Sequence, residues 1–415
     1  MTNNLFEPLQ SGFRQLHSTE TALVKVTNDL LIASDSGSLS ILILLDLSAA
    51  FDTVDHNILL SRLETVFGVS DTALKWFKSY LTDRCHFVSL NGYRSEIGLV
   101  KSGVPQGSIL GPLLFSIYMF PLGQLLRSHG LSFHFYADDT QIYIHTKPDT
   151  DVAVSILSNC ISDIKIWMTQ NFLHLNCDKT EVMLIGTPHQ LRKASPVTLS
   201  VDGSVLELQS KLKNLGVIFD SGLTFDPHVQ HTVKTSFFHL RNIARLRPML
   251  SLTVAEKLIN IFVFSRIDYC NALLPGVSKS TLNKLQYVQN SAARILTRSS
   301  ASVHITPILE SLHWLPVKFR VDFKILMLTY KALHGLAPQY LSELLSPYSP
   351  PRNLRSSNSA LLTVPQARLH CMGDRAFSCY APKLWNSLPK DIRESPSLNS
   401  FKSRLKTLLF RKAFT

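Results

Sequence analysis

Two short acidic stretches constrain the fold of this chain more than any other feature of its sequence. The first is Leu45 to Asp52, in which Asp46 ends the apolar run Ile41 to Leu45, and the second is Tyr136 to Asp139, which ends in the dipeptide Asp138-Asp139. The length and composition of the apolar run predict a buried strand that delivers Asp46 at its end. Apolar residues alternate on both sides of Asp138-Asp139, which predicts a β-hairpin with the acidic pair at its turn. Carboxylates from adjacent strands can then converge.

An Asp-Asp dipeptide in a turn also has an ordinary structural explanation, because aspartate hydrogen-bonds its own backbone in turns. The surrounding sequence favours a functional explanation. Tyr136-Ala137 precedes the acidic pair, and Ser102-Gly103-Val104-Pro105-Gln106-Gly107-Ser108-Ile109-Leu110-Gly111-Pro112-Leu113-Leu114-Phe115 lies between the two acidic stretches. These three ordered motifs resemble those of reverse transcriptases, and specifically those of non-LTR (LINE-type) retrotransposons.

Further blocks extend this resemblance over essentially the whole chain. Gln10–Arg14, together with Ser18–Leu23, is similar to the fingers motif of the family, and Asn171–Glu181 is similar to the palm motif after the catalytic hairpin. Asn214–Val217 lies where the family has its primer-grip region. Beyond residue 230 the similar blocks carry less mechanistic information; they are Asp268–Asn271, His313–Pro316 and Ala381–Asn386.

The resemblance implies an RNA-directed DNA polymerase that transfers dNTPs onto a primer 3′-hydroxyl. Such a reaction uses two Mg²⁺ ions roughly 4 Å apart, with Mn²⁺ as a possible substitute, and hard cations of this kind select carboxylate oxygens. Asp46, Asp138 and Asp139 are the implied catalytic residues and metal ligands, with a purely structural role left open for Asp139. The implied partners are an RNA template, a DNA primer, dNTPs and a separate endonuclease that supplies a nick.

The same resemblance implies five substrate-binding residues. Phe51 matches the bulky side chain beneath the incoming sugar, where it would clash with a 2′-hydroxyl; the alternative is a core aromatic residue. Gln106 and Gly107 match the motif next to the nascent base pair, where glycine permits close backbone approach. Lys179 matches a lysine that donates a proton to pyrophosphate, or is simply exposed, and Arg14 matches a triphosphate contact.

Charge divides the chain into two halves. Residues 1–230 carry 16 Lys and Arg against 22 Asp and Glu, a balance of −6, whereas residues 231–415 carry 26 against 8, a balance of +18. An acidic half that holds metals and a basic half that holds phosphates suit template-directed polymerisation. The alternatives are a basic helical domain that binds RNA or an acidic protein, and a catalytically idle relic that binds nucleic acid through its basic half.

The order of predicted elements indicates an α+β fold, because helical and strand patterns alternate over residues 30–226 without a regular βαβ rhythm. The resemblance implies a right-hand polymerase palm with partial fingers, a mostly helical thumb and a basic carboxy-terminal region. The predicted domains are 1–226 (fingers and palm), 227–345 (thumb-like), 346–360 (linker) and 361–415 (basic segment). Because Met1 comes shortly before the fingers-like motif, we also expect an amino-terminally truncated chain.

Several local elements follow from periodicity and capping. A helix is predicted with Val152, Ile156, Cys160, Ile164 and Trp167 on its packed face. One hairpin is predicted from His174-Leu175 to Val182-Met183-Leu184, and another with its turn at Asp202-Gly203. Capping-box spacing predicts a helix that begins near Thr253. A second helix is predicted with Pro316 in its first turn and Gly335 just after its end. The chain is predicted to end in an amphipathic helix over Phe401 to Phe414.

Cysteine spacing and hydropathy bear on the compartment. The six cysteines lie without a Cys-x-x-Cys pair, which predicts reduced thiols in an intracellular protein, nuclear or cytoplasmic, without zinc. His228 and His231 are predicted to lie on a helix surface. Ser108 to Leu126 is uncharged and long enough to imitate a membrane span. Glycines and prolines interrupt it, and we interpret it as a buried palm helix, without a membrane partner.

Overall fold

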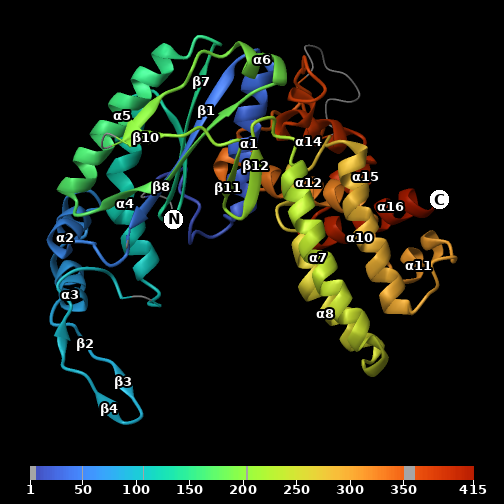
Figure 1. Ribbon diagram of the computed structural model, residues 1–415, viewed down its shortest axis with the longest axis horizontal. Helices are drawn as coiled ribbons and strands as arrows, with labels where there is room; N and C mark the ends of the chain where they lie inside the picture. The colour runs from blue at the N-terminus through green and yellow to red at the C-terminus, as the bar shows by residue number, and fades with distance from the viewer. Residues whose placement is uncertain (1–5, 49, 106, 202–203, 350–359) are drawn as a thin grey trace. The chain divides into compact units, whose positions relative to one another are not determined.

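The computed structural model describes residues 6–48, 50–105, 107–201, 204–349 and 360–415, and it is a mixed helix and sheet structure (Figure 1). The chain forms two compact units. The first contains Met1–Ser18, Ile41–Leu184 and Lys193–Gln209, and the second contains Thr19–Ser40, Ile185–Arg192 and Ser210–Thr415. Both units are discontinuous in sequence.

The first unit is built on a four-stranded sheet with the strand order β6-β7-β1-β8. Its strands are β1 (Leu39–Ser48), β6 (Ser132–Tyr136), β7 (Asp139–Thr146) and β8 (His174–Ile185). β1 is central and its first five residues are all buried, as expected for the predicted apolar strand. The hairpin predicted within 174–184 is wrong, because these residues form the single long strand β8.

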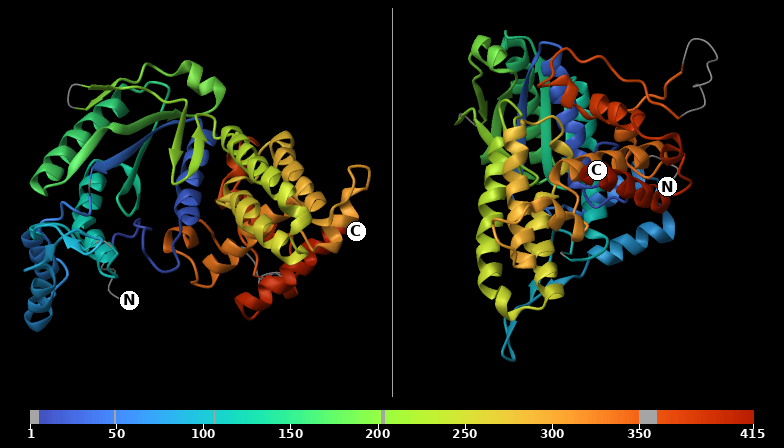
Figure 2. Two further views of the ribbon diagram at one scale, coloured as in Figure 1. Left: turned by 60° about the horizontal axis from the view of Figure 1, so that its bottom comes forward. Right: turned by 90° about the vertical axis from the view of Figure 1, so that its right-hand side faces the viewer.

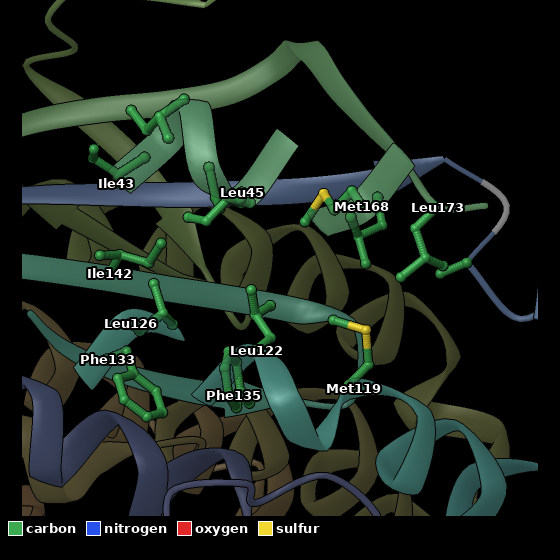
Figure 3. Close-up of a cluster of buried hydrophobic side chains, with 14 of the residues drawn as sticks. Ile43, Leu45, Met119, Leu122, Leu126, Phe133, Phe135, Ile142, Met168 and Leu173 are labelled. Atoms are coloured by element: carbon green, nitrogen blue, oxygen red, sulfur yellow. The ribbon is translucent and has the colours of Figure 1, made fainter. Parts of the chain in front are cut away.

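Helices pack on this sheet through a continuous apolar core. The two long helices are α4 (Gly111–Ser128) and α5 (Asp151–Gln170). Figure 3 shows side chains of β1, β6, β7, α4 and α5 in one cluster, among them Leu45, Leu122, Phe133, Ile142 and Met168. The predicted helix with Cys160 and Ile164 on its packed face is confirmed, although Val152 is 71% exposed because the buried face runs through Ala153 and Leu157 instead.

A membrane span is not formed by the long apolar segment that begins at Ser108. Within the described residues, no helix combines the length and the low polarity that crossing a bilayer requires. α4 is instead a buried helix of the first unit, with Leu114, Tyr118 and Leu122 fully shielded from solvent.

A buried polar cluster ties the start of the Asn171–Glu181 block to the helices. The guanidinium of Arg62 donates to the carbonyl of Tyr118 and to Oδ1 of Asn171. The hydroxyl of Tyr118 donates to the carbonyl of Asn171 at 2.6 Å. Asn171 therefore joins α2, α4 and the end of α5, which is a structural role for the first residue of a block that the sequence identified as functional.

The other elements of the first unit are short. They are α2 (His56–Thr65), α3 (Asp71–Leu81), β2 (Cys85–His86), β3 (Ser89–Leu90), β4 (Tyr93–Arg94), β5 (Gly98–Leu99), β9 (Leu199–Val201) and β10 (Ser204–Leu206). β9 and β10 pair antiparallel, which confirms the second predicted hairpin; its turn residues Asp202-Gly203 lie outside the described residues.

The second unit is mostly helical. Its elements are α1 (Thr19–Asp35), α6 (Pro188–Lys193, ending at the unit boundary), β11 (Lys211–Asn214), β12 (Val217–Asp220), α7 (Asp226–Leu246), η1 (Arg247–Met249), α8 (Leu252–Ile259), η2 (Asn260–Phe264), α9 (Ser265–Ile267), η3 (Asn271–Leu273), α10 (Lys279–Thr297), α11 (Ile305–Ser311), α12 (Val317–Leu333), α13 (Gln339–Ser342), η4 (Gly373–Arg375), α14 (Phe377–Asn386), α15 (Lys390–Arg393) and α16 (Leu398–Phe414). Helices α7 and α10 lie side by side (Figures 1 and 2).

The sequence predicted helices α12 and α16 correctly, but it predicted the wrong cap residue for α8. Pro316 and Gly335 flank α12, and Phe401, Leu405 and Leu409 form the buried face of α16, as predicted. The cap of α8 is Ser251, whose side chain accepts from the backbone of Val254, rather than the predicted Thr253.

The prediction that His228 lies on a helix surface is wrong. Its side chain is buried at the start of α7, and its Nδ1 accepts a 3.4 Å hydrogen bond from the backbone of Ile218. Burial and the nearby His231 lower the pKa of His228 to about 4. Desolvation disfavours the charged imidazolium, so this ring is neutral and structural.

Helix α1 is held within the second unit although it is close to the amino terminus. Asp35, at its end, accepts hydrogen bonds from the backbone of Arg368 at 2.9 Å and of Leu369 at 2.6 Å. The hydroxyl of Tyr340 donates to Thr21 at 3.0 Å. The helical region predicted from residue 227 onward is therefore completed by a helix more than 190 residues earlier in the sequence.

Candidate active site

The acidic pair lies at the turn of the β6–β7 hairpin, as predicted. Tyr136 pairs with Asp139, so Ala137 and Asp138 form the two-residue turn and Asp139 begins β7. Ala137 has a φ of +57°, in the left-handed region that is strained for residues other than glycine. The geometry of this turn therefore needs support from outside the hairpin.

That support comes from the amino-terminal segment 9–12. The backbone of Phe135 donates to Leu9 and accepts from Ser11, both at 2.9 Å, so the segment pairs along β6. The side-chain amide of Gln10 accepts from the backbone N–H of Ala137 at 2.9 Å and donates to its carbonyl at 3.1 Å. Both backbone polar groups of the strained residue are thus satisfied by one side chain.

Gly12 also packs closely against Ala137, and we call the contacts of Gln10 and Gly12 with this turn the cradle. A Cβ atom at position 12 would lie 2.2 Å from the backbone nitrogen of Ala137 and 2.8 Å from its Cα. Gln10 and Gly12 are therefore positioning residues for the acidic turn. Both lie in the fingers-like block of the sequence, but no local pattern predicts these contacts, because Ala137 is more than 120 positions away.

Asp46 lies on β1, the strand next to β7 in the sheet. Leu45 and Leu47 are buried on the core side, so strand alternation directs Asp46 to the other face. Its Oδ2 is shielded from solvent and has no hydrogen-bond partner. The nearest cation is Nζ of Lys179, 3.6 Å from this oxygen; Lys179 extends from β8 and its side chain is 69% exposed.

Asp139 begins β7 and Asp138 directly precedes it, and β7 neighbours β1, the strand that carries Asp46. Asp139 is exposed to solvent on one side, and the partial desolvation of its carboxyl, reinforced by the negative charges of Asp138 and Asp46, raises the pKa of Asp139 to about 6. A carboxyl that loses hydration beside two other carboxylates resists ionisation, because like charges repel more strongly where water is excluded. The structure thus brings together the three aspartates that the sequence singled out.

The donor chemistry of this cluster fits a hard divalent cation. Carboxylate oxygens are the ligands that Mg²⁺ prefers, and an oxygen without a hydrogen-bond donor, as in Asp46, is available to a metal. The ligand geometry is not preassembled, since no three His, Cys, Asp or Glu residues within the described ranges are arranged around a common metal position.

The segment 102–104 packs against the loop that follows β1. Gly103 donates to the carbonyl of Val54 at 2.7 Å, and Val104 donates to that of Phe51 at 3.0 Å. Gly103 has a φ of +90°, and a Cβ there would lie 2.9 Å from the carbonyl oxygen of Asp52. The second predicted motif is therefore fixed directly to the first.

Phe51 packs against helix α4. Its ring stacks on Phe115 of α4, with 4.4 Å between the ring centroids and 24° between the planes. The side chain is half-buried. This placement is compatible both with the predicted steric gate and with the core alternative. Asp55, in the same loop, caps α2 by accepting from Ile58 at 2.9 Å.

The remaining predicted substrate residues have different surroundings. Gly107 is exposed, with a φ of +78° and open space around its Cα; Gln106 lies outside the described residues. The guanidinium of Arg14 donates to the carbonyls of Glu7 at 2.8 Å and Gln10 at 3.0 Å. These contacts stabilise the segment that cradles the turn.

The raised pKa of Asp139 predicts how metal-free stability depends on pH. Because the folded pKa lies above the ordinary value of 3.8, the contribution of this group to stability is present below about pH 4 and lost as the pH rises through about 6. We expect Asp139→Asn to increase the free energy of unfolding at pH 7.5 by up to about 1 kcal/mol, since solvent screens this surface position. At pH 4 the gain should vanish.

Urea unfolding in EDTA at both pH values measures this effect. Glu64→Gln, which removes an exposed carboxylate from the same unit, is the matched control and should show no such dependence. An equal gain from Asp139→Asn at pH 4 and pH 7.5 would contradict the electrostatic explanation.

Comparison with known proteins identifies the family. A family model described as reverse transcriptase (RNA-dependent DNA polymerase) matches residues 1–219, more than half of the chain. The chain belongs to the reverse transcriptase family.

Several curated relatives come from Drosophila transposable elements, which confirms the predicted resemblance to the non-LTR group. The chain is 30% identical over 304 residues to a probable RNA-directed DNA polymerase from transposon BS of Drosophila melanogaster. It is 29% identical over 307 residues to the RNA-directed DNA polymerase from mobile element jockey of Drosophila funebris. The alignments cover 69% and 71% of this chain but 32% of each relative, so the chain spans about a third of their length.

Solved telomerase structures also match. An apo telomerase from Candida tropicalis is 16% identical, with 51% of this chain and 39% of that chain covered. A Candida albicans telomerase is 15% identical, with 73% and 53% covered. Both TM-scores are 0.37, which is too low to establish a common fold.

Proposed function

We propose that this chain is an RNA-directed DNA polymerase that adds dNTPs to a primer 3′-hydroxyl on an RNA template. The observation that carries the proposal is the clustering of Asp46, Asp138 and Asp139 on neighbouring strands in a member of the reverse transcriptase family. Carboxylate clusters of this kind suit phosphoryl transfer, in which the protein contributes mainly positioning and charge stabilisation.

The aspartates would hold two Mg²⁺ ions, or Mn²⁺. These ions would activate the primer hydroxyl and stabilise the charge that develops on the phosphate. In this proposal Asp46 and Asp138 are direct ligands, and Asp139 either binds or adjusts the charge of the site. Lys179 would leave its ion pair with Asp46 and donate a proton to the leaving pyrophosphate; its exposed side chain has the freedom to do so.

The substrate contacts are proposed on the family resemblance. Gln106 and Gly107 would lie against the nascent base pair, and the open space around Gly107 supports close approach of a ligand. Arg14 would contact the triphosphate only after releasing the carbonyls of Glu7 and Gln10. Phe51 would exclude the 2′-hydroxyl of a ribonucleotide. The stacking on Phe115 would hold the Phe51 ring in the position needed for this clash.

We expect Phe51→Val to relax sugar discrimination. Removing the ring leaves room for a 2′-hydroxyl, so the preference for dNTPs over rNTPs should fall by on the order of tenfold, the usual size of a small steric change. Single-nucleotide extension with a dNTP and the matching rNTP measures it. Phe67→Val, the same change to a half-buried ring outside the three motifs, is the control. Unchanged discrimination would assign Phe51 to the core.

The predicted polymerase domains are proposed in the same way. The four-stranded sheet with α4 and α5 would be the palm, preceded by partial fingers. The helices that follow residue 227 would form the thumb, 346–360 the linker and 361–415 the basic segment. The proposed partners are an RNA template, a DNA primer and a separate endonuclease. The +18 balance of residues 231–415 supports nucleic-acid binding.

Primer extension by the purified chain tests the proposal. An RNA template annealed to a DNA primer should be copied in the presence of Mg²⁺ and dNTPs, and EDTA should stop the reaction. The second candidate function is an inactive relic that binds nucleic acid. It is favoured by the +18 balance of residues 231–415, which supports nucleic-acid binding without catalysis. Both candidates bind primer-template, and only the polymerase extends it.

A further inference from the structure

Strands β2 to β5 of the first unit form a hairpin arm that extends beyond α3 (Figure 1). The arm consists of a first strand, residues 85–90, and a second strand, residues 93–99, which pair antiparallel. Every residue from 85 to 97 is exposed. A two-stranded hairpin is at best marginally stable in water, and further strands or packing against a helix normally stabilise it. The arm therefore has the properties of a partner-binding element.

The first strand of the arm has a regular, open edge. In an antiparallel ladder, hydrogen-bonded pairs alternate with pairs whose backbone groups face outward. The N–H of Val88 donates to the hydroxyl of Ser95, and the N–H of Ser95 donates to the carbonyl of Val88, both at 2.9 Å. The backbone groups of Cys85, Phe87 and Ser89 therefore face outward. None of these three residues has a backbone hydrogen bond to a described residue outside the arm.

The second strand of the arm has an interrupted edge. Ser95 and Gly98 are both paired with the first strand, and the two residues between them, Glu96 and Ile97, oppose Phe87 alone. This two-against-one arrangement is a β-bulge, which disrupts the ladder and bends the strand. Bulges and charged side chains protect an edge against the addition of another strand. Each copy of the chain thus offers one open edge on this arm.

The composition of the open edge favours pairing with another uncharged strand. The edge contains no Lys, Arg, Asp or Glu and neither Gly nor Pro, and its sequence is Cys85-His86-Phe87-Val88-Ser89-Leu90. Phe87, Val88 and Leu90 are 43%, 69% and 71% exposed. Exposed edges are usually protected by charges or proline, and this one has neither. A phosphate backbone would find no opposite charge on it, whereas a second apolar strand would bury these side chains.

We propose that this edge pairs antiparallel with the same edge of a second copy of the chain, forming a four-stranded sheet about a two-fold axis. With Phe87 on the axis, Cys85 of one copy lies opposite Ser89 of the other, and the outward-facing backbone groups of both strands meet. Arg84 then lies opposite Leu90 rather than another charge. Because each copy has one open edge on the arm, assembly closes at a dimer. The interface is small, so the dimer should be weak, with a Kd in roughly the micromolar range.

Sedimentation velocity of the full chain, from about 1 to about 100 µM, measures this dimer. Ser89→Pro should weaken it at least about tenfold, because proline removes an outward N–H that the second copy needs without removing a hydrogen bond of the arm. Arg94→Pro, at the residue paired with Ser89 but on the bulged edge, is the matched control and should change the Kd less than about twofold. Far-UV circular dichroism and the thermal midpoint verify that both variants fold.

Cross-linking tests the register independently. Ser89→Cys, in a Cys371→Ser background that removes the other exposed thiol, should form a disulfide with Cys85 of the second copy when diamide is the oxidant. Directly opposite residues of a hydrogen-bonded pair have Cα atoms about 5.5 Å apart, which suits a disulfide. Val88→Cys in the same background points to the other face of the sheet and should cross-link only at background level.

A chain that stays monomeric at about 100 µM would overturn the proposal. Loss of single-stranded DNA binding in Ser89→Pro would then assign the edge to nucleic acid instead. An unchanged dimer in Ser89→Pro, equal weakening in Arg94→Pro, or equal cross-linking of Val88→Cys would also overturn it. Species larger than a dimer that grow with concentration would show open aggregation in place of the closed pair.

Discussion

Asp138→Asn is expected to lower Mg²⁺-dependent dNTP incorporation by at least about a thousandfold while primer-template affinity stays within about twofold. The substitution keeps the shape of the side chain and removes the negative charge at the hairpin turn. Metal stabilisation of the transition state is worth several kcal/mol, and each 1.4 kcal/mol is tenfold in rate. Affinity should survive because phosphate contacts come from basic residues elsewhere. Single-turnover primer extension and filter binding measure the two quantities.

Two companion variants sharpen this test. Asp46→Asn should produce a loss of the same order, because its charge acts on the same site. Asp52→Asn removes an exposed carboxylate from the same motif as Asp46 and should retain at least half of the wild-type rate. Wild-type activity in Asp138→Asn would refute the assigned site. A comparable loss in Asp52→Asn would indicate a general effect of charge.

Gly12→Ala is expected to lower incorporation by on the order of a hundredfold, because a displacement of about 1 Å at the reacting groups has that cost. The new Cβ would lie 2.2 Å from the backbone nitrogen of Ala137, so either the acidic turn or the segment 9–12 must move. Overpacking of this kind also destabilises by about 1–3 kcal/mol. Primer extension at a temperature well below unfolding separates the two effects.

Gly98→Ala is the matched control for this substitution. A Cβ at position 98 would approach only the imidazole of His86, at 2.8 Å, and a side chain can move where a backbone cannot. Gly98→Ala should therefore retain near wild-type incorporation. Wild-type rates in Gly12→Ala would show that the cradle formed by Gln10 and Gly12 does not position the turn.

Local sequence patterns correctly predicted the strand and the hairpin that carry the three candidate aspartates. The apolar run before Asp46 forms β1, and the alternation around Asp138-Asp139 forms the β6–β7 hairpin. These predictions succeeded because strand periodicity and turn formation depend on residues a few positions apart. The same reasoning failed for β8, since its polar middle resembles a turn but pairing along β1 keeps it extended.

The sequence by itself determined the family, the three aspartates and the type of most elements, because these properties depend on residue type and short spacing. Only the tertiary structure decided that Gln10 satisfies the strained Ala137 and that α1 completes the second unit. Each of these contacts joins residues more than 120 positions apart in the sequence. Their partners are chosen by how the sheet and helices pack, and no local pattern encodes that choice.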